Sequence, residues 1–175
     1  MKKTLLFTAL FILAFQGYSQ AAKYGVRAGV TISNLDFEKK PTLENQHRNG
    51  FYIGFLADFN LSKNISLQPE IQFSAEGAKQ ELIQLDYLQA PILLKLRLGN
   101  KMHLGAGPQV GLKIHKKDDG IRNMAYSAVG ALEYKLNYAL FIDARYTYGI
   151  SNIFDEYLGV SAKNSTIQLG VGYKF

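Results

Sequence analysis

Cysteine is absent from the sequence, and its absence excludes several kinds of chemistry at once. None of the 175 residues is Cys, so the chain can form no disulfide, no thiolate metal site and no cysteine nucleophile. Long apolar runs are also missing after the first 20 residues, and none approaches the roughly 20 residues that a transmembrane helix needs. A chain without disulfides or transmembrane helices must gain its stability in another way. A closed barrel, in which the backbone groups of all strands are hydrogen-bonded, is one such way.

Sequence signals for catalysis, metals and nucleic acid are scarce as well. The chain has three histidines, and no Gly-rich phosphate loop, metal-spaced cluster or calcium loop appears. The formal net charge is +6, but the basic residues are scattered, and the densest group, around His115, is followed at once by Asp118 and Asp119. We therefore predict no cofactor, no metal and no nucleic-acid partner. A lipid-modifying enzyme that uses His115 and Ser127 stays a weaker alternative, because no motif links these two residues.

The first residues have the features of an export signal. Two lysines precede an apolar stretch over residues 5–15, and Gly17 and Ser19 place small residues at the −3 and −1 positions of a cleavage site. This pattern predicts a secretory signal peptide over residues 1–19. The remaining chain, residues 20–175, suits one domain.

Beyond residue 20 the dominant hydrophobic period is two, which is typical of β-strands whose two faces meet different surroundings. Eight segments show it, at residues 24–33, 51–61, 65–74, 82–98, 102–113, 126–135, 138–149 and 165–175. The connections between them are alternately short and long, as in outer-membrane barrels. We therefore predict an all-β fold, an eight-stranded antiparallel up-and-down transmembrane β-barrel.

The two faces of these segments differ in charge, and the difference predicts which face meets lipid. The apolar face carries almost no charge, and a charge there would cost about 2–4 kcal/mol at the bilayer midplane. An eight-stranded barrel has room inside only for its side chains, and unpaired buried charge is very costly. We therefore predict a filled lumen without an open pore. Its charge network should consist of the charged residues on the polar face: Arg27, Asp58, Glu70, Lys95, Arg97, Glu133, Asp143 and Arg145.

Aromatic residues and loops complete the expected membrane topology. Outward Tyr and Phe residues cluster near both ends of the segments, as interfacial aromatic girdles do. The longer connections should lie outside the cell, and two of them, about 35–50 and 150–164, are the expected contact surfaces for a protein partner.

The last segment, residues 165–175, also ends in aromatic residues. Tyr173 and Phe175 lie on its apolar face, and an aromatic residue at the end of an alternating strand resembles the signal that the bacterial barrel-assembly machinery recognises. We therefore expect that machinery as a partner during biogenesis, and outer-membrane lipid as the lasting one.

Three stretches resemble a known family. Residues 87–95, Tyr-Leu-Gln-Ala-Pro-Ile-Leu-Leu-Lys, are similar to the Y-L-E-x-P-L-L-L-K strand of PorT-like outer-membrane β-barrel proteins. Residues 105–108 resemble its G-x-G-P segment, and residues 145–152 resemble its R-Y-x-x-G-L-x-N segment. One departure is Gln89 in place of Glu, which removes an interior carboxylate and any pairing it would make with Lys95 or Arg145. The resemblance implies an integral outer-membrane barrel of Gram-negative bacteria and assigns no reaction.

The sequence thus favours a small integral outer-membrane barrel that is not an enzyme and has a structural or interaction role through its extracellular loops. A soluble periplasmic or secreted barrel that binds an apolar ligand is the alternative. It requires the opposite facing of every strand, so the orientation of the side chains separates the two.

Overall fold

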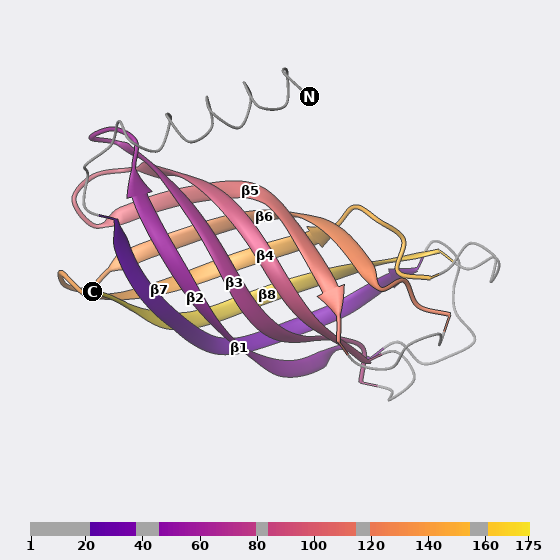
Figure 1. Cartoon of the computed structure of the whole chain (residues 1–175). Coiled ribbons are helices and arrows are strands. Elements are labelled where there is room, and N and C mark those ends of the chain that lie inside the picture. The colour runs from indigo at the N-terminus through magenta and orange to yellow at the C-terminus, as the bar shows by residue number, and fades with distance from the viewer. Residues whose placement is uncertain (1–21, 38–45, 80–83, 115–119, 155–160) are drawn as a thin grey trace, which may run out of the picture.

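The alternating segments form eight β-strands, each hydrogen-bonded antiparallel to its neighbours in a closed barrel (Figure 1). The computed structural model describes residues 22–37, 46–79, 84–114, 120–154 and 161–175. The predicted fold class is confirmed. The strands are β1 (Lys23–Phe37), β2 (Arg48–Asn60), β3 (Ile65–Gly77), β4 (Gln84–Arg97), β5 (Met102–Lys113), β6 (Met124–Lys135), β7 (Leu140–Gly149) and β8 (Ala162–Lys174).

Closure comes from pairing between the first and last strands. β1 and β8 run antiparallel over the whole length of β8, starting with Gly25 opposite Lys174. Just beyond this ladder, the backbones of Tyr24 and Phe175 exchange two hydrogen bonds, of 3.2 and 2.8 Å. Lipid offers backbone N–H and C=O groups no partner, so a barrel in a membrane needs this closure.

Side chains alternate between the outer surface and the lumen along the strands. On β4, Leu88, Ile92 and Leu94 are 41%, 47% and 49% exposed, whereas Gln89 and Lys95 are each 3% exposed. The other strands repeat this alternation. The apolar face therefore points outward. The alternative of a soluble barrel with an apolar interior is wrong, because it needs the opposite facing.

Two leucines interrupt the polar face in the sequence, and both point into the lumen. Leu56 is 4% exposed and Leu93 is completely buried. Leu93 packs against Val129 and Ala131. Leu56 lies beside Gly25, where an added Cβ would come within 3.2 Å of the leucine Cδ1. Both leucines fill lumen space that no charged side chain occupies.

Three tight turns join β2 to β3, β4 to β5 and β6 to β7 at one end of the barrel, which we call the short-turn end. The Ser62 hydroxyl and the Asn137 amide oxygen accept hydrogen bonds of 2.7–3.3 Å from backbone N–H groups two and three residues further on. Gly99 has a φ of 117°, which glycine adopts without strain. The longer connections lie at the opposite, long-loop end. In outer-membrane barrels the short turns face the periplasm.

Strands β1 and β8 extend further toward the long-loop end than the alternation predicted. β1 continues to Phe37 and β8 begins at Ala162. The reason is a reversal of polarity above the lipid, where the outward face meets water. Leu35 points inward and is completely buried, while Asp36 is exposed. A pattern that expects apolar residues outside therefore stops too early.

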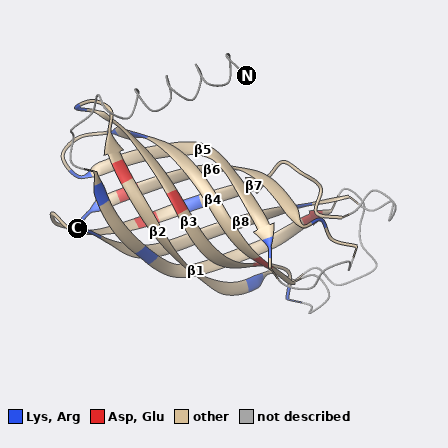
Figure 2. Cartoon of the chain, viewed as in Figure 1, with Lys and Arg blue, Asp and Glu red and all other residues tan. Residues whose placement is uncertain are grey.

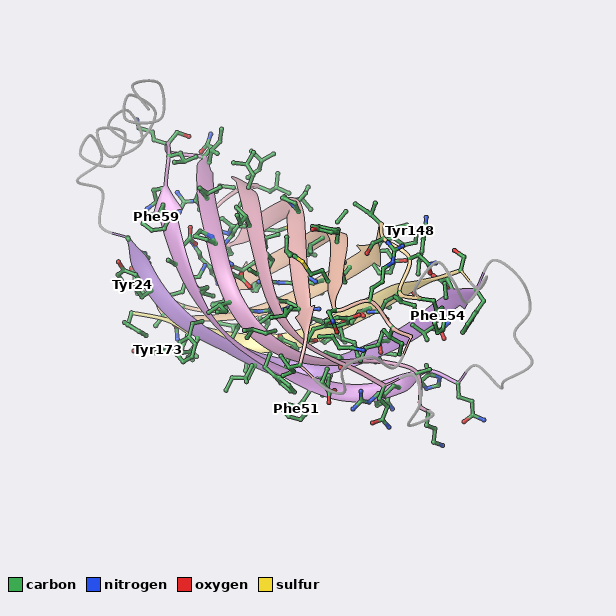
Figure 3. The ribbon with its side chains drawn as sticks, turned by 45° about the vertical axis from the view of Figure 1, so that its right-hand side comes forward. Tyr24, Phe51, Phe59, Tyr148, Phe154 and Tyr173 are labelled. Atoms are coloured by element: carbon green, nitrogen blue, oxygen red, sulfur yellow. The ribbon has the colours of Figure 1, made fainter. Side chains whose placement is uncertain are left out.

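Outward aromatic residues lie at both ends of the barrel. Figure 3 shows Tyr24, Phe59 and Tyr173 around the short-turn end and Tyr148 near the other end, and all four are exposed. This arrangement fits two interfacial girdles. Tyr138 differs from the prediction, since it lies in a turn before β7 and is fully exposed.

Some sequence predictions fall on residues that the structure leaves out. The expected signal peptide, residues 1–19, and the candidate catalytic residue His115 lie outside the described residues, as do residues 38–45 and 155–160 of the two expected contact surfaces. Among the described residues, no helix is both long and apolar enough to cross a membrane.

The outward facing predicts that the cost of a charge depends on its depth. We expect Leu94→Arg to block assembly, because arginine on the lipid face costs about 2–4 kcal/mol near the midplane and only about 0–1 kcal/mol near the interfaces. Leu98→Arg is the matched control, since Leu98 is 54% exposed but belongs to the tight turn after β4. Heat-dependent gel mobility of outer-membrane fractions measures folding, and equal folded amounts of both variants would contradict the assigned facing.

Candidate functional site

The lumen holds two ion-pair clusters, and each contains two cations and two carboxylates. Every strand except β5 contributes to one of them, so the pairs join strands from all around the barrel. Figure 2 shows basic and acidic positions on neighbouring strands in the half of the barrel that holds the C-terminus. The central cluster comprises Arg27, Glu70, Asp143 and Arg145, and the lower cluster, nearer the short-turn end, comprises Asp58, Lys95, Glu133 and Lys174.

In the central cluster both arginines share both carboxylates. Arg145 donates two hydrogen bonds of 2.7 Å to Glu70 and one of 2.8 Å to Asp143. Arg27 donates 2.7 Å hydrogen bonds to Asp143 and to the Gln72 amide oxygen. The fork-shaped guanidinium suits such bidentate contact with a carboxylate. All four charged residues are less than a tenth exposed, so each depends on the others for its charge to be tolerated.

In the lower cluster two lysines lie between two carboxylates. Lys95 reaches Glu133 at 2.7 Å and Asp58 at 3.2 Å. Lys174 reaches the same two carboxylates, each at 2.8 Å. Gln68 also accepts a 2.6 Å hydrogen bond from Lys95. The lower cluster is thus as neutral as the central one.

One aromatic ring lies against a cation of each cluster, and a glycine makes room for each ring. The Tyr52 ring centre is 4.1 Å from the Arg27 guanidinium carbon, and the Phe141 ring centre is 4.7 Å from the Lys174 ammonium. A Cβ at Gly170 would collide with the Tyr52 hydroxyl, and one at Gly172 with the Phe141 ring. The two glycines of β8 therefore allow two large rings to lie inside a narrow barrel.

A third polar group, Glu76, lies above the central cluster and was missed by the sequence reasoning. Its carboxylate accepts hydrogen bonds from Ser74 at 2.8 Å, Gln89 at 2.9 Å and Asn164 at 2.6 Å, and it forms no ion pair with any described residue. Gln89 also accepts a 2.7 Å hydrogen bond from Gln72. The Gln89 amide thus links the central cluster to Glu76 through Gln72.

The lumen differs from the expected charge network at two residues. Arg97 is exposed at the short-turn mouth, and no ion pair joins it to a described residue, because it is the last residue of β4 and lies outside the filled part of the lumen. Lys174 belongs to the lower cluster although it was not expected there. Its alternation with Tyr173 and Phe175 was the signal that could have placed it in the lumen.

An apolar cluster closes the lumen at the long-loop end, and we call it the outer cluster. Leu85 and Tyr87 of β4 pack with buried residues from three of the long connections, Ala78, Ile121 and Ile153, and from the long-loop ends of β1 and β8. Two isolated β-bridges, between His47 and Ala78 and between Ile121 and Phe154, join these connections in pairs. The buried members are Leu35, Ala78, Leu85, Tyr87, Ile121, Ile153 and Ala162.

The described residues offer little to a metal or to catalysis. No group of three or more His, Asp or Glu side chains among them could hold a metal ion. His47 lies opposite Ala78 in an isolated β-bridge, and in the strand ladders His103 lies opposite Arg97 and Glu133. The carboxylates of the two clusters are held by cations, so the arrangement can balance charge but offers no free acid and base.

The mutual pairing in the central cluster predicts a large loss of stability when one arginine is removed. We expect Arg145→Met to lower the free energy of unfolding by about 3–5 kcal/mol, because it leaves Glu70 and Asp143 buried with one cation between them. Arg48→Met is the control, since the 3.0 Å pair of Arg48 with Asp86 is partly exposed and such a pair contributes about 0–1 kcal/mol. Urea unfolding followed by circular dichroism measures both, and similar losses would contradict the role given to the cluster.

Comparisons with known proteins agree with this architecture. The family model for the outer membrane protein beta-barrel domain matches residues 16–155, whereas the comparison with curated proteins finds no match. Among solved structures, the chain is similar to Ail, the attachment invasion locus protein of Yersinia pestis, at 16% identity and a TM-score of 0.53, with 89% of this chain and 100% of that chain covered. It is also similar to neisserial surface protein A, at 14% identity and a TM-score of 0.60, with 89% and 100% covered. The chain belongs to the outer membrane protein beta-barrel domain family and is a small integral barrel of the bacterial outer membrane.

Proposed function

We propose that this protein is a closed, non-enzymatic barrel that holds an interaction surface at its long-loop end. The observation that carries the proposal is the outer cluster, which packs residues of three long connections and of the long-loop ends of β1, β4 and β8 into one unit above a filled lumen. Connections held in this way can present their outer residues to a partner with little loss of conformational entropy on binding.

The proposal that the lumen is closed is supported by the small volume of the space between the central and lower clusters. The cavity between the central and lower clusters, beside Leu93 and His103, has a volume of about 10 Å³, which is about the space of one water molecule. The outer cluster then covers the other end with apolar side chains. A large and stable single-channel conductance from the purified protein would contradict this part of the proposal.

The interaction role is supported by contacts that hold the long connections together. The Asn152 amide oxygen accepts hydrogen bonds from the backbone N–H groups of Phe154 and Ala162, at 3.2 and 2.9 Å. The backbone N–H of Arg122, in the connection before β6, donates a 2.8 Å hydrogen bond to Ile153 in the connection before β8. Neighbouring connections therefore support one another, which suits a surface that binds a partner.

A lipid-modifying enzyme is the less favoured function. Its one candidate pair is His115 with Ser127, and Ser127 lies opposite Gln109 and Gly149 in the strand ladders. Neither neighbour is a base that could activate a serine. Unchanged membrane lipids after replacement of His115 would leave the enzyme hypothesis without a candidate residue.

Two buried leucines on the same strand allow a matched test of the interaction surface. We expect Leu85→Ala, in the outer cluster, to reduce cross-linking of the barrel to surface partners on intact cells. Leu93→Ala should leave cross-linking unchanged, although both substitutions create a cavity and cost about 2–5 kcal/mol. Both leucines are completely buried. The proposal would be contradicted if both variants lost cross-linked species equally, or if the parent protein formed no cross-linked species.

We also propose that residues 1–19 are removed on export and that Tyr173 and Phe175 form the signal for barrel assembly. The two outward rings are 47% and 69% exposed, and their centres lie 6.4 Å apart. They offer an assembly factor an apolar edge beside the seam between β1 and β8. An N-terminus at Met1 in the outer-membrane protein would contradict the removal.

The proposed assembly signal predicts an effect that depends on position. We expect Phe175→Ala to lower the amount of folded protein in the outer membrane several-fold. Phe59→Ala, at the same end of the barrel and 36% exposed, should lower it little, because it removes a girdle ring without touching the seam. Similar levels of the two variants, measured by heat-dependent gel mobility, would show that Phe175 acts only as a girdle residue.

We further propose that the chain belongs to the PorT-like branch of its family. The support is the stretch over residues 87–95, where Tyr87, Gln89 and Lys95 point into the lumen as buried residues. A family alignment that groups the chain with another branch would contradict this.

A further inference from the structure

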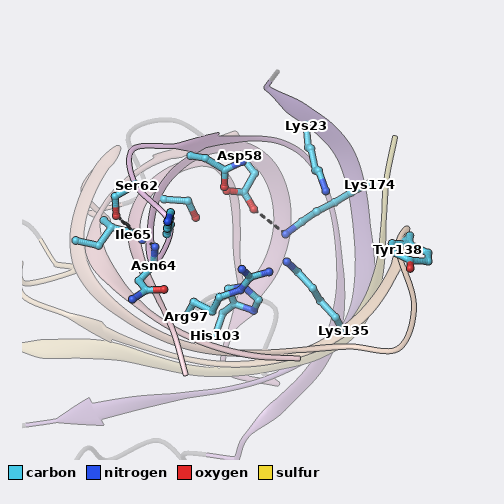
Figure 4. Close-up of a pocket in the computed structure, with 13 residues that line it drawn as sticks. Lys23, Asp58, Ser62, Asn64, Ile65, Arg97, His103, Lys135, Tyr138 and Lys174 are labelled. Carbon is cyan, nitrogen blue, oxygen red and sulfur yellow. Dashed lines mark hydrogen bonds and ion pairs between the residues drawn. The ribbon is translucent and has the colours of Figure 1, made fainter. Parts of the chain in front are cut away.

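The mouth of the barrel at the short-turn end contains a cavity of about 330 Å³ whose lining includes five cations and one carboxylate. Figure 4 shows Lys23, Arg97, Lys135 and Lys174 arranged around this mouth, with their charged ends directed toward its centre. Lys63 also lines it, and Asp58 contributes its one carboxylate. A volume of this size is within the range of small-molecule sites.

The positive charge of this mouth is not neutralised from within the barrel. The lower cluster beneath it is balanced, since Lys95 and Lys174 share both Asp58 and Glu133. The negative charge of Asp58 is therefore already balanced within the lower cluster and does not neutralise the cations above it. Lys23, Lys63, Arg97 and Lys135 form no ion pair with any described residue, so four positive charges remain in excess around one cavity.

Within the part of the chain that the structure describes, a buried polar atom at the bottom of the cavity also lacks a hydrogen-bond partner. His103 is 7% exposed and lines both this cavity and the small one beneath it. Its Nδ1 atom has no hydrogen-bond partner among the described residues. A buried ring nitrogen is normally hydrogen-bonded, and its partner is often water or a ligand when the protein supplies none.

The strand register explains why these groups meet. Arg97 of β4 lies directly opposite His103 of β5, and His103 lies opposite Glu133 of β6, two residues before Lys135. Lys23 of β1 lies opposite Asp58 of β2. The lining residues come from the ends of seven strands, β1 to β6 and β8, and the barrel fixes their spacing before any ligand arrives.

We infer that this mouth is a binding site for a phosphate-bearing anion with two or more negative charges. Phosphate offers several acceptor oxygens that point in different directions, which suits a guanidinium and separate ammonium groups converging from different strands. The site lies at the opposite end of the barrel from the proposed interaction surface, so it stands independently of that function. The same chemistry is available from a soluble phosphate compound or from a lipid headgroup at the periplasmic leaflet.

Binding of inorganic pyrophosphate tests the inference directly. The probe is titrated calorimetrically, at fixed ionic strength, into the protein in nanodiscs of phosphatidylcholine. We expect saturable binding that Arg97→Gln with Lys135→Gln weakens by about tenfold or more, since charge-assisted hydrogen bonds are lost. The control, Lys79→Gln with Lys163→Gln, removes the same charge at the long-loop end and should leave binding unchanged. Heat-dependent gel mobility verifies that both double variants are folded.

Nanodiscs with added phosphatidylglycerol distinguish the two sources of phosphate. Weaker pyrophosphate binding in these discs than in phosphatidylcholine would identify the anionic headgroup as a competing occupant of the site. Unchanged binding would identify a soluble phosphate compound, and both results support the site. An absence of saturable binding in phosphatidylcholine discs, or equal weakening by the two double variants, would overturn it.

Discussion

Lipid provides no hydrogen-bond partner for a peptide group, and the rest of this structure depends on that constraint. It requires the ladder to close, and closure with eight strands leaves a lumen that side chains must fill. Half of the residues in each strand point into this narrow space. Any charge placed there loses its hydration and must find an opposite charge within reach. The pairing of β1 with β8 and the neutrality of the two clusters are thus consequences of one requirement.

Charge neutrality alone does not let the side chains fit into the lumen, because long side chains also need volume. The chain provides this volume by placing small residues on some strands and large residues on others. β5 contributes Gly105 to the wall of the lower cluster, where a Cβ would come within 3.2 Å of the Lys95 side chain. On β8, Gly170 and Gly172 leave space for Tyr52 and Phe141. Small residues on two strands therefore allow charged and aromatic residues of the others to meet near the axis.

The fold was predictable from the sequence because it depends on facing, and facing is encoded in a period of two. That Arg27 and Asp143 both point inward could be inferred in the same way. Their contact could not, because it joins residues 116 positions apart, and the stagger between strands determines which inward residues share a level. The same missing information led to the inclusion of Arg97, whereas the alternation of Lys174 with Tyr173 and Phe175 could have placed Lys174 in the lumen.

The sequence pattern failed most clearly where the surroundings of the strands change. Above the lipid the outward face meets water, so polar residues point outward there and apolar residues such as Leu35 and Leu85 point inward. A fixed rule of apolar outside and polar inside therefore ends the strands too early and misses the outer cluster. Glu76 escaped notice for a related reason, since it lies close to this boundary and is held by neutral side chains.

The two ends of the lumen are closed by different physical means, and this difference suggests how the molecule is divided. At the long-loop end, apolar side chains exclude water and need no counterion. At the short-turn end, the lower cluster uses all of its carboxylates internally, and the cations above it face an open cavity. An apolar seal is insensitive to salt, whereas a ring of like charges is attracted to anions and depends on ionic strength. The barrel therefore has an apolar, packed surface at its long-loop end and a positively charged surface at its short-turn end. The central and lower ion-pair clusters lie between the two.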